Sequence, residues 1–583
     1  MMMLGVGASA GAQLSSSVAG AWAHLLDSDV PDMGIDMALD RDAVYYLSTA
    51  GSSAAKAPSL AVYFDNTQVA TGAVYNGNST NNNLNLVKLD RDGNLQWCLY
   101  STEGDLQSNN GNIAILPDGS LIVTAVIRHT DGRGTHPFTI VDAAGKATSL
   151  SWTLVSDDDS RFYQGLMMRV DADGNLLWTK MLNVSNAPQP GYDKPTTSAF
   201  YLSGLTTEAS GNFIVAGRYC NPLTIKRADG STLTLTPHNT ADWNGDAQAT
   251  RGDIFIARFN PDGLLLDYRV TEGVATVETS PVLARCGDDL LLNFIAAGTE
   301  AMKFAGADFS LRSDNHALIT MRLDGDLKAK WINVLQADSI NAKKPFFQAN
   351  TLNVAGDNLW LTGMGNFVIT DVASTVSNSP REGFVFKFDL DNGSLLAATT
   401  SRKAFPSTNA ITGYMGAFES AEQDDNRVFL YGYCWNGSAV TLSALDKTTL
   451  DADEMITLIA GGSMPTSQVM AATGNRLFTV SRGRDNGMEA QRFRPVNSDI
   501  ALASRDWAAC YACFELGFNV LEPDDTPATP GDLNGDGSVN AGDVSSLYEA
   551  ILYGNADSTF DLNADGSVNA GDVSALYSII LTR

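Results

Sequence analysis

The feature that most constrains the fold of this chain is a short motif that recurs along roughly its first five hundred residues. Each copy has an apolar strand, a tight turn rich in Asp, Asn and Gly, and a second strand that often ends in Trp. Asp-Gly and Asn-Gly pairs supply the positive φ angles of a tight turn, and the flanks alternate apolar with polar residues, so the motif predicts a β-hairpin. Five clear copies occupy residues 86–97, 168–178, 256–266, 320–331 and 386–396, and weaker copies begin near Ala444 and Arg492.

A second type of strand lies between successive hairpins. It is apolar at nearly every position, as expected for a strand that is buried on both faces, and a shorter strand precedes it. These apolar runs begin near Asp42, Asp118, Gly211, Asp288, Gly356, Asn426 and Gly474. The pattern therefore predicts seven units of about four strands each.

Radial repetition of four-stranded sheets limits the exposure of strand edges. We therefore predict an all-β fold, a seven-bladed β-propeller over residues 20–520. Residues 21–26 form an extra copy of the Trp-bearing strand, which we expect to pair with the last blade and close the ring. The hairpin resembles those of bacterial quinoprotein-type and related secreted propellers at the level of pattern. Long segments at 50–83, 129–160 and 223–252 are expected to project from one face, as a binding surface or as plain surface loops.

Two copies of a twelve-residue loop follow an acidic, Pro-rich linker at residues 521–530. Each copy places oxygen-bearing side chains at positions 1, 3, 5, 9 and 12, a backbone carbonyl at position 7 and Gly at position 6 for the sharp bend. Ca²⁺ takes six to eight hard oxygen ligands, so this spacing predicts two calcium ions in residues 531–583. The expected ligands are Asp532, Asn534, Asp536, Ser538, Asn540 and Asp543 in the first loop, and Asp561, Asn563, Asp565, Ser567, Asn569 and Asp572 in the second.

Each loop runs into one apolar helix, at residues 544–552 and 573–581, and carries Asp rather than Glu at position 12. In these respects residues 531–581 resemble the paired repeats of the dockerin type I family. The resemblance implies a small all-α domain that becomes ordered on binding Ca²⁺, near-twofold symmetry, and docking to a cohesin-like protein. By association it also implies a role in extracellular polysaccharide breakdown.

One departure from the family pattern concerns the partner. Positions 10 and 11, which often carry partner-reading side chains in cellulosomal dockerins, are Ala541-Gly542 and Ala570-Gly571 here. Such small residues offer little for specific recognition. An intramolecular partner or a scaffold on the cell surface is therefore an alternative to a cohesin-like protein.

Two further motifs are weaker. Residues 242–253 form an imperfect third calcium loop with Ala247 at the position that requires Gly. Cys510 and Cys513 form an isolated Cys-Tyr-Ala-Cys motif, and without a second pair or a nearby His they favour a local disulfide or two plain thiols over zinc or redox chemistry.

Charge and targeting signals limit the partners and the compartment. Acidic residues outnumber basic ones by 66 to 38, which gives a formal charge of -28 at pH 7. Such a surface repels phosphate backbones, so no nucleic-acid partner is expected. No apolar run is long enough to span a membrane. Residues 1–13, with small residues before Gln13, are expected to be a signal-peptide remnant or a disordered tail. We therefore expect a bacterial protein that is secreted or displayed on the cell surface.

No catalytic motif is visible in the sequence. Glycoside hydrolysis needs only two carboxylates across a groove, and the acidic residues are too many for the sequence to nominate a pair. The favoured hypothesis is a calcium-binding protein whose dockerin-like module mediates docking and whose propeller binds a glycan or protein in extracellular polysaccharide utilisation. The alternative is a carbohydrate-active enzyme, an O-glycosyl hydrolase or lyase, with its active site on the propeller face.

Overall fold

The computed structural model of the chain forms two compact units, residues 1–521 and residues 522–583. In the first unit it describes residues 13–28, 32–52, 59–73, 81–102, 105–129, 134–154, 162–185, 200–238, 252–273, 275, 277–338, 346–369, 375–376, 382–406, 411–422, 425–434, 439–460, 469–484, 493–504 and 507–521. In the second it describes residues 531, 533, 539, 541–553, 560, 562–563 and 567–582.

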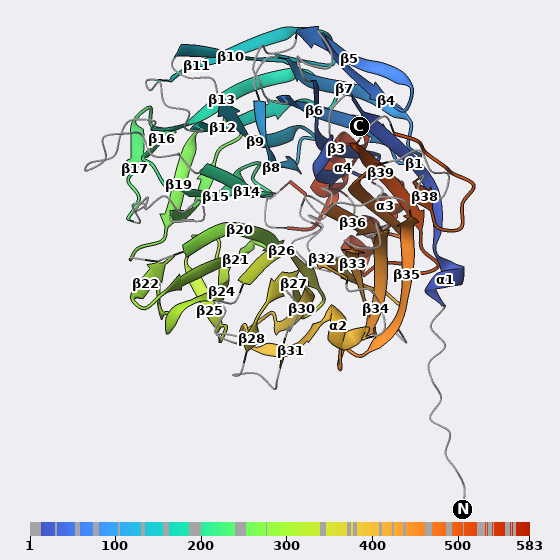
Figure 1. The fold of residues 1–583 in the computed structure, drawn as a ribbon. Coiled ribbons are helices and arrows are strands. Elements are labelled where there is room, and N and C mark those ends of the chain that lie inside the picture. The colour runs from blue at the N-terminus through green and yellow to red at the C-terminus, as the bar shows by residue number, and fades with distance from the viewer. Residues whose placement is uncertain are drawn as a thin grey trace, which may run out of the picture. The chain divides into compact units, whose positions relative to one another are not determined.

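The first unit is a seven-bladed β-propeller, as predicted, whose sheets follow one another around a central axis (Figure 1). Each blade begins with an inner strand, which pairs with a second strand. The inner strands of blades 1 to 7 are β2 (Met33–Leu39), β8 (Asp105–Ile115), β14 (Phe200–Thr207), β20 (Val277–Cys286), β26 (Phe346–Ala355), β32 (Gly413–Glu419) and β36 (Val469–Thr473). The second strands are β3 (Ala43–Ser52), β9 (Leu121–His129), β15 (Phe213–Tyr219), β21 (Asp289–Gly298), β27 (Asn358–Asn366), β33 (Arg427–Cys434) and β37 (Arg476–Arg484).

A third and an outer strand complete each blade, and six of the seven pairs are the hairpins that the sequence predicts. The third strands are β6 (Asn81–Asp90), β12 (Phe162–Val170), β18 (Asp253–Phe259), β24 (Ser313–Leu323), β30 (Glu382–Asp389), β34 (Ala439–Asp446) and β39 (Trp507–Glu515). The outer strands are β7 (Leu95–Thr102), β13 (Leu176–Val184), β19 (Leu265–Val270), β25 (Ala329–Gln336), β31 (Leu395–Thr400), β35 (Ala452–Ala460) and β1 (Ala19–Asp27).

The ring is closed by the two ends of the propeller chain. Strand β1, from the amino-terminal end, is the outer strand of blade 7 and pairs antiparallel with β39, with Trp22 opposite Cys513 and Leu25 opposite Cys510. This confirms the expected closure by residues 21–26. The weak hairpin expected near Arg492 is wrong, because β38 (Arg494–Pro495) is a short strand that pairs with β35 in blade 6.

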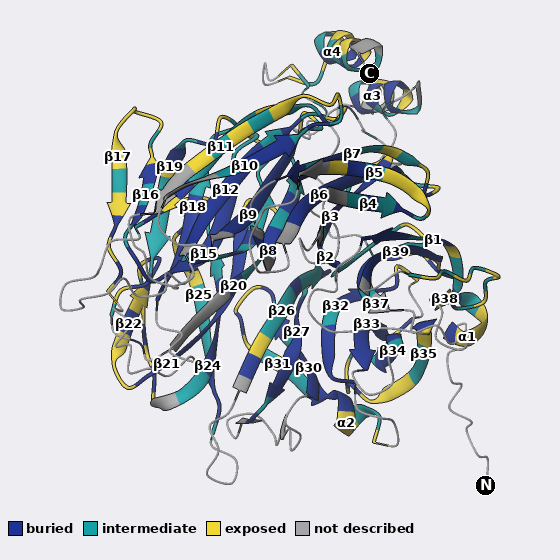
Figure 2. Ribbon diagram, turned by 45° about the horizontal axis from the view of Figure 1, so that its top comes forward, coloured by how far each residue is buried: buried dark blue, intermediate teal, exposed yellow. Residues whose placement is uncertain are grey.

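The apolar second strands explain why the ring is stable. Apolar residues on the two faces of each sheet pack against the neighbouring blades, and they form seven hydrophobic clusters, one at each interface between adjacent blades. Strands β15, β21 and β33 are buried at every residue. Figure 2 shows these buried strands inside partly exposed outer strands.

The long segments predicted to project as loops contain hairpins that extend neighbouring blades. β4 (Ser59–Phe64) and β5 (Thr67–Ala73) lie beside β1, β10 (Gly134–Val141) and β11 (Ala147–Leu154) beside β7, and β16 (Leu223–Lys226) and β17 (Thr232–Leu235) beside β13. Each of these hairpins leaves one blade and joins the outer edge of the blade before it. The described parts of these segments therefore add strands to the outer edges of blades 7, 1 and 2.

Six short elements complete the list for the described part of this unit. These are the strand pairs β22 (Ala301–Phe304) with β23 (Ala307–Ser310) and β28 (Val368–Ile369) with β29 (Thr375–Val376), and the one-turn helices α1 (Leu14–Ser17) and α2 (Ser401–Ala404).

The tight turns between third and outer strands contact the preceding blade. In four blades the turn contains a Gly with positive φ that lies under a Trp ring on the outer strand of the preceding blade. The indole N–H of that Trp donates to a carbonyl of the same turn, at 3.0–3.1 Å. The pairs are Trp22 with Gly93, Trp97 with Gly174, Trp178 with Gly263 and Trp331 with Gly393.

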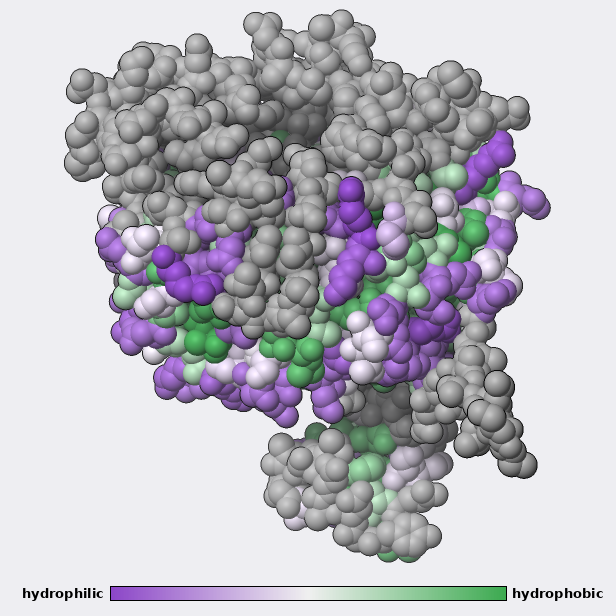
Figure 3. Space-filling view, turned by 60° about the horizontal axis from the view of Figure 1, so that its bottom comes forward, coloured by the Kyte–Doolittle hydropathy of each residue, from purple (hydrophilic) through white to green (hydrophobic). Residues whose placement is uncertain are grey.

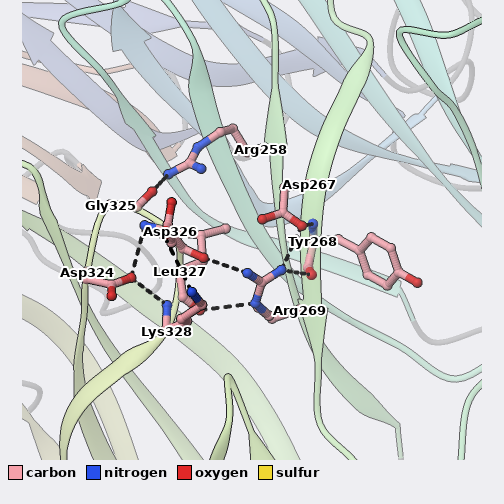
Figure 4. A network of polar contacts seen from close by, with 9 residues as sticks. All are labelled: Arg258, Asp267, Tyr268, Arg269, Asp324, Gly325, Asp326, Leu327 and Lys328. Atoms are coloured by element: carbon pink, nitrogen blue, oxygen red, sulfur yellow. Dashed lines mark hydrogen bonds and ion pairs between the residues drawn. The ribbon is translucent and has the colours of Figure 1, made fainter.

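Two turns lack this pairing and show how the space is filled. The outer strands of blades 3 and 5 carry Asp267 and Ala397 at the Trp position. The facing turns then carry Leu327 and Leu450, which keep the positive φ of the Gly (57° and 59°) and are buried. Arg269 donates to the Leu327 carbonyl at 3.1 Å instead of an indole (Figure 4). The space between adjacent blades is therefore filled in one of two ways. Either a Trp ring faces a Gly, or an Asp or Ala faces a buried Leu.

A basic residue on the third strand adds a polar tie at the same interface. It lies opposite the Trp position and donates to a turn carbonyl of the next blade. The pairs are Lys88 with Ala172, Arg169 with Pro261, Arg258 with Gly325, Arg322 with Leu390 and Lys387 with Lys447.

We predict that Gly174→Ala destabilises the propeller more than Gly119→Ala. Both glycines have positive φ, so each substitution incurs the left-handed cost of about 1–2 kcal/mol. A Cβ at Gly174 would also lie 2.6 Å from the Ala143 Cβ and 2.8 Å from the Trp97 ring, whereas a Cβ at Gly119 would meet nothing within 4 Å. Overpacking should add about 1–3 kcal/mol, measured by urea unfolding. Equal losses of stability in the two variants would show that close packing against Ala143 and Trp97 contributes nothing.

Candidate functional site

The second unit contains two helices of equal length, α3 (Ala541–Tyr553) and α4 (Ala570–Thr582). They enclose a small apolar core in which matching residues of the two sequence repeats come together. Its buried members are Val544 and Leu547 on α3 and Val573 and Leu576 on α4. The matched partly buried residues are Leu533 with Leu562, Val539 with Val568, and Ile551 with Ile580. The described part of this unit is thus helical, as predicted, and repeats itself internally.

Asp572 explains why α4 begins where it does. The side chain of Asn569 accepts the amide of Gly571 at 2.7 Å, and Asp572 accepts the amide of Asn569 at 2.8 Å. This reciprocal arrangement is a capping box at the helix start. Asp572 also accepts the amide of Asn563 at 3.2 Å, so its carboxylate joins the loop to the helix.

Asp543 is the matching residue of the first repeat, and it accepts the amide of Leu533 at 2.7 Å. Both aspartates are fully buried. Burial raises the pKa of Asp572, but the amides of Asn569, Asn563 and Leu562 outweigh it and lower the pKa from its ordinary value. Asp572 is therefore a carboxylate at neutral pH, which is the form that binds a metal.

The predicted calcium ligands are described only in part. The structure describes Asp543 in the first loop, and Asn563, Ser567, Asn569 and Asp572 in the second. It brings Asn563, Asn569 and Asp572 together, and the side-chain amide of Asn569 donates to the Ser567 carbonyl at 3.0 Å. Outside the described residues lie Asp532, Asn534, Asp536, Ser538, Asn540, Asp561 and Asp565.

The helices also present large apolar side chains that the sequence reasoning did not single out. Tyr548 and Leu552 on α3 are 54% and 76% exposed, and Tyr577 on α4 is 48% exposed. Tyr548 and Tyr577 occupy matching positions of the two repeats. The available signal was an aromatic residue one position after the buried Leu of each helix.

In the propeller, Asp36 is an acidic residue on an inner strand, where it links blades 1 and 2. Its two carboxyl oxygens accept the amide of Met37 on its own strand and the amide of Ile113 on β8, both at 2.9 Å. Burial raises its pKa to about 6, against the opposing effect of these hydrogen bonds. The sequence signal was a single charge within the apolar run 33–39.

We predict that the stability of the wild-type protein relative to Asp36→Asn rises as pH falls from about 7.5 to about 4. A folded-state pKa above the unfolded value means that the folded protein favours the protonated carboxyl, so the cost of ionisation disappears as pH falls through about 6. The relative gain should reach at most about 3 kcal/mol, because one pKa unit corresponds to about 1.4 kcal/mol. Urea unfolding of both proteins across this range measures it. A difference that stays constant with pH would contradict the assignment.

Cys510 and Cys513 lie on opposite faces of β39. Cys510 belongs to the cluster between blades 6 and 7, and Cys513 to the cluster between blades 7 and 1. Both are free thiols, and burial raises the pKa of each to about 12. The local disulfide is therefore wrong, because residues three apart in a strand point to opposite faces.

The weak third calcium loop is described only at its end, since residues 242–251 lie outside the described residues. Asp253 opens β18 and is fully buried. It accepts the backbone amide of His238 at 2.7 Å and contacts the His238 ring nitrogen Nδ1 at 2.9 Å. This carboxylate therefore ties the end of the blade 3 insertion to the blade. Among the described residues of both units, no group of three or more His, Cys, Asp or Glu side chains is placed to hold a metal ion.

Comparison with known proteins adds one family. Residues 530–581 match the family model of the dockerin type I domain. No curated protein matches the chain. Among solved structures, the chain is similar to the Dos1 propeller, at 12% identity over 85% of this chain and 95% of that chain, with a TM-score of 0.36.

Similarity to two enzymes of known structure is equally weak. The quinohemoprotein alcohol dehydrogenase of Pseudomonas putida HK5 is 10% identical over 97% of this chain and 91% of its own, with a TM-score of 0.37. That of Comamonas testosteroni is 11% identical over 98% and 92%, also with a TM-score of 0.37. Scores this low carry no argument about function, and the propeller assignment rests on the strand pairings. The chain thus forms a seven-bladed β-propeller that is followed in the sequence by a segment, residues 530–581, similar to the dockerin type I family.

Proposed function

We propose that this is a secreted or cell-surface calcium-binding protein, in which the dockerin module docks to a partner and the propeller binds a glycan or protein ligand in polysaccharide utilisation. The observation that carries the proposal is the pair of buried aspartates, Asp543 and Asp572, that close the two loops. Type I dockerin domains typically bind calcium and occur in extracellular, cell-surface proteins. No described helix has the length and apolar character needed to cross a membrane.

The donor set fits calcium because it consists of oxygen atoms. In the second loop, Asn563, Asn569 and Asp572 would contribute side-chain oxygens and Ser567 its carbonyl, with Asp561 and Asp565 completing the set. The first loop would use Asp532, Asn534, Asp536, the Ser538 carbonyl, Asn540 and Asp543. A bound Ca²⁺ would neutralise the carboxylates that the loops gather and so stabilise the folded module.

The docking surface is proposed to be the exposed faces of the helices. A dockerin domain implies a cohesin partner. Since loop positions 10 and 11 are Ala-Gly in both repeats, recognition would rest on Tyr548, Leu552 and Tyr577. Tyrosine suits such a surface, because its ring is apolar and its hydroxyl can bond to a partner. The same surface could instead bind an intramolecular or cell-surface scaffold partner.

We predict that Asp572→Asn reduces the calcium stoichiometry of the full-length protein from about two ions to about one, and that Asp543→Asn with Asp572→Asn removes both. Isothermal titration with CaCl₂ measures the ion count. The matched control is Asp92→Asn, which changes an exposed turn carboxylate of the propeller, 79% exposed, and should leave two ions bound. Unchanged binding in the double variant would contradict the proposed sites.

The enzyme alternative has a weaker basis. Asp36 has the raised pKa of a proton donor, but both its oxygens accept backbone amides, so it serves as a structural tie. A glycosidase also needs a second carboxylate across the bond that it cleaves.

We predict that the full-length protein binds polysaccharide on a glycan array without releasing reducing sugar from the glycans it binds. A binding protein needs only contacts with the ligand, whereas a hydrolase must also supply an acid and a base or nucleophile. Assay of both properties on the same preparation separates the hypotheses. Release of reducing ends that exceeds that of heat-inactivated protein would support the enzyme.

A further inference from the structure

A cavity of about 330 Å³ lies between blades 3 and 4, where three tight turns meet. One turn belongs to blade 3 and two belong to blade 4, and two arginines reach the cavity from strands β18 and β20. The residues that matter to the argument are Glu208, Ser210, Asn212, Arg258, Arg285 and Asp288. All are described, and the volume is at the small end of the range for small-molecule sites.

Arg285 departs from the pattern that the other blades set. It is the inner-strand residue that pairs with Leu290, which in turn pairs with Leu323 just before the tight turn. The equivalent residues in the other blades are Leu39, Ile115, Thr207, Val354, Glu419 and Ala472. Five of these six are uncharged, so the blade does not require a cation at this position.

One nitrogen of the Arg285 guanidinium group has no hydrogen-bond acceptor in the described part of the chain. Arg285 donates from Nη2 to the Gly287 carbonyl at 2.8 Å. Its Nη1 lies 3.5 Å from Glu208 Oε1, and this buried atom makes no hydrogen bond within the described part of the chain. A buried donor without an acceptor costs free energy that a bound acceptor would recover.

Arg258 already uses the other side of Glu208. It donates from Nε and Nη2 to Glu208 Oε1 at 3.1 and 2.9 Å, and from Nη2 to the Gly325 carbonyl at 2.6 Å. Figure 4 shows Arg258 directed toward Gly325 in the blade 4 turn, with Arg269 directed to the same turn from the outer strand. Arg258 is thus held by Glu208 and the Gly325 carbonyl, whereas Nη1 of Arg285 has only the longer ion pair with Glu208 and can accept a ligand oxygen as a hydrogen-bond partner.

The local charge favours an oxyanion. Arg258, Arg285 and Glu208 are 14%, 18% and 13% exposed, so two guanidinium groups share one carboxylate in a partly dehydrated site. Asp288 is exposed at the rim, where solvent screens its charge. The planar guanidinium presents two parallel N–H groups that match a carboxylate. The Ser210 hydroxyl and the Asn212 amide line the same cavity and can bond to hydroxyl groups.

We propose that this cavity binds a carboxylate-bearing sugar, such as a uronic acid unit, with Arg285 contacting the carboxylate. The proposal rests on the proposed glycan-binding function and names the class of glycan. It also accounts for a cation at a position where the other blades have mostly aliphatic residues.

The test is titration of the full-length protein with sodium glucuronate, with glucose as the neutral counterpart and acetate as a carboxylate without hydroxyl groups. Glucuronate should bind at least about tenfold more tightly than glucose, because a hydrogen bond to a charged group contributes about that much. It should also bind more tightly than acetate, which lacks the hydroxyl groups that Ser210 and Asn212 can bond to. Arg285→Val, which copies Val354 of blade 5, should weaken glucuronate binding by about tenfold or more. Glu208→Gln should strengthen it, because it removes the carboxylate that competes for both guanidinium groups.

Arg322→Gln is the matched control, because Arg322 is the blade 4 counterpart of Arg258 and does not line the cavity. It should leave glucuronate binding unchanged, and circular dichroism should show that all three variants fold. No glucuronate binding, equal binding of glucose, or unchanged affinity in Arg285→Val would each overturn the proposal.

The same variants on a glycan array separate this proposal from the broader one. If Arg285→Val binds acidic and neutral glycans as the wild-type protein does, the cavity proposal fails and glycan binding by the propeller stands. If the array shows no binding while glucuronate binds through Arg285, the cavity stands and the role in binding polysaccharide fails.

Discussion

Each blade of this propeller must bury both faces of its sheet against its neighbours, and the rest of the structure follows from that constraint. Burial on both faces favours apolar side chains on the second strands, and β15, β21 and β33 are buried at every residue. Polar contacts between blades include third-strand lysines and arginines that reach turn carbonyls of the next blade. The tight turn is therefore both the end of a hairpin and a contact between blades. This dual role explains why its Gly and the facing Trp occur together.

Much of the fold could be predicted from the sequence because its signals are local. Asp-Gly turns, apolar runs and the Trp-bearing strand at residues 21–26 each report a conformation or a burial pattern within a few residues. The insertion hairpins could not be placed in the same way. Whether β10 extends its own blade or the one before it depends on which edge is open in three dimensions. Leu327 and Leu450 at positive φ were equally hidden, because their conformation is tolerated only where the preceding blade lacks a Trp.

The candidate sites also differ in whether local sequence is enough to predict them. The proposed calcium loops are predicted from spacing alone, since each proposed ligand set lies within twelve consecutive residues. Of these proposed ligands, Asp543 and Asp572 are buried and lie in the first turns of α3 and α4. The cavity with Arg285 assembles residues from three turns and two strands of adjacent blades, so no stretch of sequence contains it. Five of the six residues equivalent to Arg285 are uncharged and the sixth is Glu419, so this cation stands out only when the blades are compared in register.

Hydrogen–deuterium exchange of the full-length protein, with excess calcium and with EDTA, tests the central claim that calcium stabilises the docking module. We expect the amides of α3 and α4 to be protected with calcium and to exchange rapidly in EDTA, while those of the buried propeller strands are unchanged. Equal protection of the two helices in both conditions would contradict it, because helices that are stable without the ion would leave the two loops no role in folding the module.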